Sequence, residues 1–449
     1  MSLPVHDSLR ADAIEYLQQL LRLDTTSPPG NEILATDYIR GVLDAEGIES
    51  TVLESAPGRA NLVARLSAAN PTGKPVLLMG HTDVVGVEPG KWKRGPFSGD
   101  LVDGELWGRG ALDMKCQVAA GLAAFVAIKR SGVQLNRDLI YYAIADEEAG
   151  GTYGADWMWK NHRDLVDAEF AINEGGGNPI EAGGALFFAC QAGEKGSCRL
   201  RMVARGTPGH GSVPLDDTAM RHLGEALVKL HAWKPPTVIT APVRSMLTTL
   251  AEALGGETAD LVSAILAEES PDWSLFTNLP LPPAELESLY ATTRNTAVPT
   301  MIHGGVRINV IPAEVVVDID GRTLPHQDPE AFRSAVQAAV GDGVEIELVS
   351  PAVGIESDPD SPFFDAIAAT IYDMQPGSRL LPYMLSGGTD AGLLPGVKVY
   401  GFFPFPPSER IEGYNGLVHG HNERIHVDDL AYATQFIHDL VIRFAGTEA

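Results

Sequence analysis

Cysteine is scarce in this chain, with only three among 449 residues. Disulfide frameworks and cysteine-based zinc sites need more thiols, or pairs at C-x-x-C spacing, and the sequence has neither. The N-terminal stretch also lacks the basic start and apolar centre of a secretory signal peptide. We therefore expect reduced thiols and a cytoplasmic location.

Basic residues and long apolar runs are also under-represented. Lys and Arg total 33 against 59 Asp and Glu, giving a formal net charge of −26, and no Lys/Arg block occurs. Nucleic acids and anionic membranes are bound by clustered basic side chains. The longest mostly apolar run, residues 118–128, is too short to cross a bilayer. We expect neither nucleic acid nor membrane as a partner.

Strands and helices alternate over the first part of the chain. Continuous apolar runs such as "VLLMG" (residues 76–80) and "LIYYAIA" (139–145) predict strands that are covered on both faces. Segments with helical spacing, such as 7–23 and 115–130, lie between the strand candidates. This alternation predicts an α/β fold with a mixed, mostly parallel sheet sandwiched by helices.

The pattern changes between residues 197 and 350. "CRLRMVARG" and "EVVVDIDGR" alternate apolar and polar residues, which is typical of half-exposed antiparallel strands. Helical stretches lie between them, together with a long Pro-rich excursion. The α/β pattern returns after residue 351. We therefore predict one α/β domain, residues 1–196 and 351–449, interrupted by an inserted α+β domain at 197–350.

Acidic side chains and imidazoles follow the predicted strands where these end, and one more acid precedes the helix at 115–130. A single residue of this kind is typical of a solvated loop, but a series of them next to apolar strands is not. The carboxyl ends of strands in α/β folds form a common edge, and His, Asp and Glu are metal ligands. We predict a metal site at this edge. The candidates are His81, Asp83, Asp113, Glu147, Glu148, Glu174 and, near the end of the chain, His419.

Several motifs together resemble a known family: the co-catalytic zinc hydrolases that include aminoacylase, acetylornithine deacetylase, succinyl-diaminopimelate desuccinylase, glutamate carboxypeptidase and several dipeptidases. Their order and spacing agree over nearly the whole chain. The motifs are "GHTDVV" (80–85), "WGRGALDMK" (107–115), "ADEEAGG" (145–151), "NEGGG" (173–177), "GTPGHGS" (206–212), "INVIPAE" (308–314), "SGGTDA" (386–391) and "HGHNER" (419–424).

The resemblance implies two zinc ions per chain, with cobalt or manganese as possible substitutes. Asp113 would bridge the ions and be followed by a cis peptide bond. His81 and Glu174 would complete one ion, and Glu148 and His419 the other. His421 competes with His419, which we prefer because the family's ligand precedes the glutamate of "NE" by four residues.

The same resemblance assigns the chemistry. Asp83 would orient the His81 imidazole, and Glu147 would be the general base. His210 would stabilise the oxyanion, and in dimeric members of the family it reaches the partner's active site. The inserted domain would thus serve as a lid and dimerisation domain of a homodimer, while the α/β domain would be catalytic.

Substrate-binding candidates come from the lid and from a Gly-rich loop. Family members bind a free carboxylate, and Arg suits a bidentate contact with one. The candidates are Arg307, Asn309, Arg322, Gly387 and Gly388. The expected substrate is a small N-acyl amino acid or short peptide with a free carboxylate. A strict dipeptidase or carboxypeptidase is the alternative. A metal-stabilised binding protein without catalysis is disfavoured because Glu147 is retained.

Overall fold

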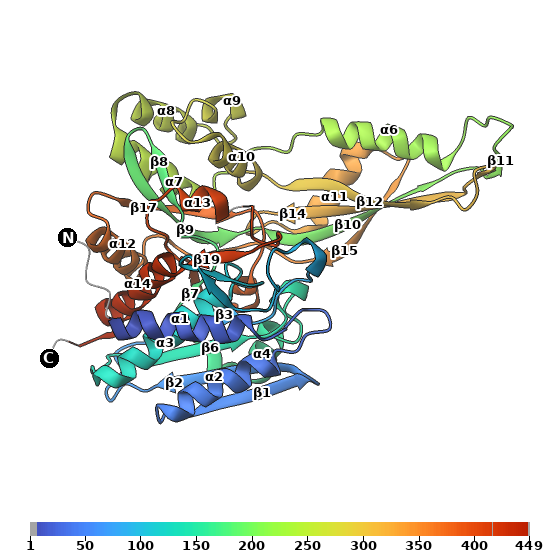
Figure 1. Ribbon diagram of the computed structural model, residues 1–449. Helices are drawn as coiled ribbons and strands as arrows, with labels where there is room; N and C mark the ends of the chain where they lie inside the picture. The colour runs from blue at the N-terminus through green and yellow to red at the C-terminus, as the bar shows by residue number, and fades with distance from the viewer. Residues whose placement is uncertain (1–6, 415, 448–449) are drawn as a thin grey trace. The chain divides into compact units, whose positions relative to one another are not determined.

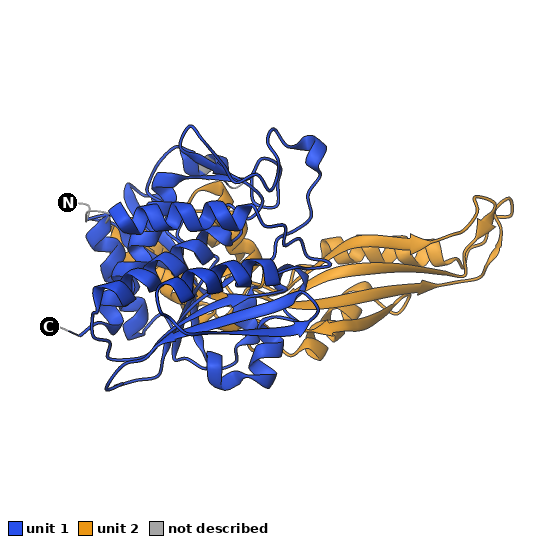
Figure 2. Cartoon of the chain, turned by 60° about the horizontal axis from the view of Figure 1, so that its bottom comes forward, with its two compact units in different colours: residues 1–192, 357–382, 389–449 blue, residues 193–356, 383–388 orange. Residues whose placement is uncertain are grey.

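The computed structural model describes residues 7–414 and 416–447. The chain folds as two compact units (Figure 2). The first comprises residues 1–192, 357–382 and 389–449, and the second comprises 193–356 and 383–388. The predicted insertion, 197–350, lies within the second unit. The short return segment 383–388 joins that unit because the Lys195 amide donates to the Leu385 carbonyl at 3.1 Å, a pairing of distant segments that sequence patterns do not reveal.

Helices of the first unit pack around an extended sheet (Figure 1). They are α1 (Asp7–Leu21), α2 (Ile33–Ala45), α3 (Lys115–Ser131), α4 (Ala155–Asn161), α5 (Arg163–Val166), α12 (Pro362–Met374), α13 (Arg410–Tyr414) and α14 (Val427–Ala445). Helix α3 packs against both α1 and α14, α12 packs against α14, and α2 covers the first two strands. Because α3 is apolar around almost its whole circumference, it is buried among these elements.

The main sheet has parallel strands at its centre and antiparallel strands toward its edges. Its strand order is β1-β2-β6-β3-β7-β18-β9-β16, with β8 and β17 also paired to β9. Strand β3 pairs in parallel with β6 and β7, and β7 pairs in parallel with β18. The predicted mixed α/β fold is therefore confirmed. The strands are β1 (Ser50–Ala56), β2 (Arg59–Leu66), β3 (Val76–His81), β6 (Leu139–Ile144), β7 (Phe170–Asn173), β8 (Pro179–Ala182), β9 (Ala185–Glu194), β16 (Ile355–Glu356), β17 (Arg379–Leu385) and β18 (Lys398–Gly401).

A small three-stranded sheet also belongs to the first unit. It comprises β4 (Asp100–Val102), β5 (Glu105–Trp107) and β19 (Arg424–His426). In it, β5 pairs with β19 in the antiparallel direction. This pairing brings the segment after residue 107 beside the segment before residue 424, although more than 300 residues separate them.

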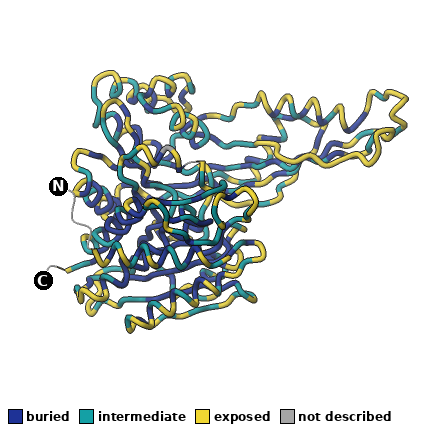
Figure 3. The backbone as a smooth tube through the Cα atoms, in the orientation of Figure 1, coloured by how far each residue is buried: buried dark blue, intermediate teal, exposed yellow. Residues whose placement is uncertain are grey.

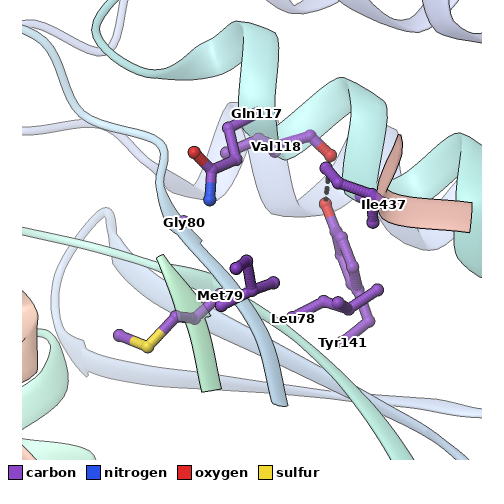
Figure 4. Close-up of a pocket in the computed structure, with 9 residues that line it drawn as sticks. Leu78, Met79, Gly80, Gln117, Val118, Tyr141 and Ile437 are labelled. Carbon is purple, nitrogen blue, oxygen red and sulfur yellow. Dashed lines mark hydrogen bonds between the residues drawn. The ribbon is translucent and has the colours of Figure 1, made fainter. Parts of the chain in front are cut away.

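Burial is greatest in the central strands and in α3 (Figure 3). All six residues of β3 and all six of β6 are buried, which accounts for their continuously apolar sequences. Between β3 and α3 lies a cavity of ≈ 10 Å³ (Figure 4). The Tyr141 hydroxyl crosses toward α3 and donates to the Val118 carbonyl at 3.1 Å. The cavity lies beside Gly80, the residue that precedes His81 in β3.

The second unit has a four-stranded antiparallel sheet of order β12-β14-β10-β15. Every second residue of β14 is buried, and these side chains pack against α6 and α11, as the alternating pattern predicts. The elements are β10 (Gly196–Arg205), β11 (Gly209–His210), α6 (Ala219–Ala232), β12 (Thr296–Gly304), β13 (Val310–Ile311), β14 (Glu314–Thr323), α11 (Pro329–Val340) and β15 (Glu345–Pro351).

The Pro-rich excursion of this unit is largely helical. It contains α7 (Ala241–Leu254), α8 (Gly256–Ala267), α9 (Trp273–Phe276) and α10 (Pro283–Thr292). Pro242 and Pro283 lie in the first turns of α7 and α10, where a missing amide hydrogen costs nothing. The prolines thus begin helices here. Throughout the described residues, helices are too short or too polar to traverse a membrane.

Candidate metal centre

The strand ends of the first unit bring the predicted ligands together. His81 is the last residue of β3 and lies opposite Ile144, the last residue of β6. Glu147 and Glu148 follow β6 in a short 3-10 turn, and Glu174 directly follows β7. Because β3 pairs in parallel with β6 and β7, all these side chains emerge at one edge of the sheet, as predicted.

Two clusters of potential ligands share Asp113. In the first, His81 Nε2 lies 3.1 Å from Asp113 Oδ1 and 3.8 Å from Glu174 Oε1. In the second, His419 Nε2 lies 3.0 Å from Asp113 Oδ2 and 3.2 Å from Glu148 Oε2. Asp113 therefore offers one oxygen to each cluster. Within each cluster the ligand atoms lie within 4.8 Å of one another.

The donor set fits two divalent cations. Imidazole nitrogens and carboxylate oxygens bind zinc at about 2.0–2.2 Å, so donors 3–4 Å apart can surround one ion. Glu148 Oε1 is buried and makes no hydrogen bond within the described chain, which leaves an acceptor available to a cation. The Asp113–Met114 peptide bond is cis, as the resemblance implied.

Concentrated charge shifts the pKa values of the metal-free site. Burial raises the pKa of Glu147 to about 7 and holds the pKa of Glu174 well above its ordinary range. Hydrogen bonds with Asp113 and Glu148 raise the pKa of His419 to about 10. Burial opposes charge on His81, but Glu174, Asp113 and Asp83 outweigh it and raise its pKa. A bound cation would reverse this balance by favouring anionic carboxylates and neutral imidazoles.

Asp83 contacts the site differently from expectation. His81 Nδ1 lies 3.0 Å from the Asp83 backbone carbonyl and 3.6 Å from its carboxylate oxygen Oδ1. The carboxylate oxygens instead accept the backbone amides of Glu147 and Glu148, each at 3.1 Å. Asp83 therefore orients the imidazole through its main chain and fixes the turn carrying the proposed base through its side chain.

The turn after β6 places Glu147 beside the first cluster. Glu147 Oε2 lies 4.0 Å from His81 Nε2, and its side chain is largely buried. Asp146 precedes it with φ of 71°, in the left-handed region, and is held by an ion pair with Arg59. The carboxylate thus lies at the edge of the ligand cluster, where a general base is needed.

Similarity to known proteins extends over most of the chain. The model of Peptidase family M20/M25/M40 matches residues 77–443. The chain belongs to this family. As a member of the M20 family it is a hydrolase that acts on amide bonds, with acyl amino acids or peptides as substrates.

Individual relatives agree with this membership. The chain is 28% identical to pig (Sus scrofa) aminoacylase-1, with 92% of this chain and 90% of the relative covered. Its fold resembles an M20 metallo-carboxypeptidase from Sulfolobus solfataricus, with a TM-score of 0.70, 19% identity, and 98% and 99% coverage. It also resembles a dinuclear metal-binding M20 peptidase from Bacillus subtilis, with a TM-score of 0.60, 14% identity, and 97% and 98% coverage.

His421, the competing ligand candidate, lies apart from both clusters. Its Nε2 is 3.7 Å from Glu88 Oε1. His419 has φ of 58°, and this left-handed conformation accompanies the approach of its ring to Asp113 and Glu148. Within this M20 chain, the geometry favours His419.

The predicted substrate-contacting residues of the second unit lie in three separate segments. His210 pairs with Val310 in a short two-stranded ladder, and the Gly211 amide donates to the Asn309 carbonyl at 2.9 Å. Arg307 lies in the same turn, and its carbonyl accepts the Val310 amide. Arg322 lies instead on β14, paired with Asp320 at 3.0 Å. Gly387 and Gly388 form the end of the returning segment.

Sequence reasoning missed two buried charges in the first unit. Arg109 and Glu423 form an ion pair of 2.6 Å, with side-chain exposures of 2% and 0%. Both residues lie inside the quoted motifs "WGRGALDMK" and "HGHNER". Arg109, a charged residue without ligand chemistry inside such a motif, was the available signal, but its contact with Glu423 depends on the pairing of β5 with β19.

Proposed function

We propose that this M20 hydrolase is a two-zinc amidohydrolase that cleaves small N-acyl amino acids with a free carboxylate. The observation that carries the proposal is the pair of ligand clusters sharing Asp113, with Glu147 4.0 Å from His81. The similarity to pig aminoacylase-1 over 92% of the chain supports an acylated amino acid as substrate.

In this proposal His81, Asp113 and Glu174 hold one zinc ion, and Asp113, Glu148 and His419 hold the other. Cobalt or manganese would suit the same carboxylate-rich donors. The bound ions supply positive charge that acidifies a water molecule and polarises the scissile carbonyl.

Glu147 is the proposed proton carrier. Its carboxylate lies outside both ligand clusters, so it can accept a proton from water as the amide carbonyl is attacked. The same carboxyl group can then donate this proton to the leaving nitrogen. Asp83 assists indirectly, because its two oxygens fix the amides of residues 147 and 148.

His210 and the residues near it are proposed to act on the substrate from the second unit. His210 would donate a hydrogen bond to the oxyanion, and Arg307, Asn309 or Arg322, with the Gly387–Gly388 turn, would bind the substrate carboxylate. The His210 side chain is exposed, with Nδ1 2.7 Å from Ser212 Oγ, so its Nε2 can face a ligand.

A homodimer formed through the second unit is part of the proposal. Strand β12 is an edge strand, and it exposes Val298, Met301 and Ile302. Apolar edge strands are templates for pairing with another chain. A second copy would cover this edge and present His210 in trans. The buried, unpaired cysteines suit a reducing cytoplasm.

The test is a mass-spectrometric hydrolysis screen with zinc-loaded protein. N-acetyl and N-succinyl amino acids are compared with unblocked dipeptides, each with and without a chelator. Chelator-sensitive cleavage of the blocked compounds is the expected result. Cleavage confined to free dipeptides would make the protein a peptidase, of the dipeptidase or carboxypeptidase type. Metal binding without cleavage of any compound would favour a binding protein.

A further inference from the structure

Two segments carry ligands of the second cluster and are far apart in sequence. Asp113 lies in the loop before α3, and His419 lies in the loop before β19. Neither residue is in a strand of the main sheet, unlike His81 at the end of β3. Other contacts must therefore fix the positions of these two loops relative to each other.

Glu423 holds the first loop by accepting four hydrogen bonds. Its Oε1 accepts the amides of Leu112 at 2.7 Å and Asp113 at 3.1 Å. Its Oε2 accepts the Gly110 amide at 3.1 Å and Arg109 Nη1 at 2.6 Å. The carboxylate thus fixes the backbone on which Asp113 is mounted.

Arg109 extends the same contact to the second loop. Its Nη2 donates to the carbonyls of Gly420 at 2.9 Å and His419 at 3.2 Å. His419 has a left-handed backbone, so its conformation depends on such external contacts. The guanidinium also lies over the Trp92 ring, 5.4 Å from its centroid, which restricts its orientation.

We propose that Arg109 and Glu423 are positioning residues that form one clamp, which locks the Asp113 and His419 loops together and sets the affinity of the second metal position. This inference rests on the proposed function for its metal, but the clamp itself is a property of the metal-free chain. Burying a charged pair is costly. Arg109 Nε is buried without a hydrogen-bond partner among the described residues, whereas both Glu423 oxygens and both Arg109 Nη atoms make hydrogen bonds, and these join the two ligand loops.

The clamp should act unequally on the two ions. The first cluster takes His81 from the end of β3, Glu174 from the position after β7, and only Asp113 from a clamped loop. The second takes both Asp113 and His419 from the clamped loops and only Glu148 from the turn after β6. Loosening the clamp should therefore weaken the second ion more than the first.

Glu423→Gln is the sharpest variant. A carboxylate accepts all four bonds, whereas the amide oxygen of glutamine accepts at one side only and its NH₂ group would face two donors. We expect zinc affinity at the second position to fall about 10–100-fold, the effect typical of losing an outer support of a metal ligand. Affinity at the first position should change less.

The matched control is Asp429→Asn. Asp429 is also fully buried and accepts from Arg410 at 2.6 Å and from the Tyr414 hydroxyl at 2.7 Å. Asp429 contacts neither ligand loop. If a general loss of stability were enough to weaken zinc binding, Asp429→Asn would weaken it as much as Glu423→Gln does. Zinc affinities of this variant should match those of the wild type.

The experiment combines zinc competition titrations of the full chain with hydrogen exchange of the metal-free protein. In Glu423→Gln, exchange should accelerate in residues 108–113 and 417–422, and the second ion should bind more weakly. Unchanged exchange in both loops, or wild-type affinity for both ions, would overturn the clamp.

Failure of the wild type to bind two ions would instead refute the proposed function, while hydrogen exchange in the two loops would still test the clamp. If Glu423→Gln does not fold, Arg109→Lys, which keeps the charge but loses the two-pronged geometry, replaces it.

Discussion

Glu147 and Glu148 are adjacent acids in different surroundings. Glu148 takes part in the second ligand cluster, whereas Glu147 stands outside both clusters and has a pKa raised by burial to about 7. A carboxylate that is not a ligand keeps its lone pairs for proton transfer. The difference between the two neighbours comes from the turn that Asp83 holds through both amides.

The first prediction separates these two roles. Glu147→Gln should keep the zinc content of the wild type, because the residue belongs to neither ligand cluster. Its kcat should fall about 10²–10⁴-fold, the usual contribution of a general base. Metal analysis and steady-state kinetics on the same preparation check this. Glu148→Gln serves as the comparison and should lose metal; wild-type turnover in Glu147→Gln would remove Glu147 from the mechanism.

The second prediction concerns protons released by metal binding. Hydrogen bonds with Asp113 and Glu148 raise the pKa of His419 to about 10, so this ring is protonated at pH 7 in the metal-free site; the pKa values of His81 and of Glu174 are also raised. Imidazoles and carboxylates must lose their protons to bind zinc, so binding should release protons, including the one on His419. Because the metal-free state binds more protons, zinc affinity should rise with pH up to about the His419 pKa of 10.

Calorimetry in buffers of different ionisation enthalpy measures this release directly. His419→Gln should release about one proton fewer, because it removes the charged His419 ring. Identical heats in all buffers would mean that the imidazoles are already neutral in the metal-free protein.

Among the helices and strands, the small cavity between β3 and α3 gives a prediction about the free energy of unfolding. Gly121 lies inside α3, and a Cβ placed there would meet the Tyr141 ring at 3.5 Å, an ordinary contact. Gly121→Ala should stabilise the first unit by about 0.5–1 kcal/mol, because alanine costs less entropy in a helix. Chemical denaturation followed by circular dichroism checks this.

Gly80 provides the contrast on the opposite wall of the same cavity. A Cβ there would lie 3.0 Å from Val118 Cγ2 and 3.1 Å from Met114 Cε. Gly80→Ala should therefore destabilise the protein and disturb the neighbouring His81. Equal effects of the two substitutions would show that helix propensity and local crowding do not control this part of the core.

Elements with a clear periodicity were predictable from the sequence, and those made by distant pairing were not. The apolar strands β3 and β6 and the alternating β14 follow directly from their patterns. The short strands β4, β5 and β19 carry no such signal, because three residues cannot show a period. The helices of the Pro-rich excursion were missed because prolines at helix starts resemble loop signals.

The same distinction applies to the candidate site. Ligand types at strand ends predict a metal centre because the parallel strands share one edge. The main-chain contact of Asp83 with His81 and the Arg109–Glu423 clamp were out of reach, since both depend on the path of the backbone rather than on residue type. Residues that hold ligands are therefore harder to predict than the ligands themselves.

The whole molecule is expected to need two copies for activity. The net charge of −26 opposes close approach of two chains, so a dimer requires a strong local attraction. The edge strand β12 with its exposed apolar residues supplies a surface of that kind. If the active site is assembled from two chains, mixed dimers of two inactive variants should regain activity, which can be measured.

Mixing two inactive variants tests this assembly. His210→Ala and Glu147→Ala chains should each be inactive alone, yet a mixed dimer contains one site with an intact Glu147 and an intact His210 from the partner. Random re-association after mild denaturation should restore about a quarter of wild-type activity, because half of the dimers are mixed and each has one complete site. A mixture of Glu147→Ala with Asp113→Asn should restore none, since both changes fall in the same unit. Light scattering must show dimers throughout. Turnover by His210→Ala chains alone would remove His210 from catalysis, and activity that stays absent in the first mixture, with dimers present, would place His210 in its own chain's site.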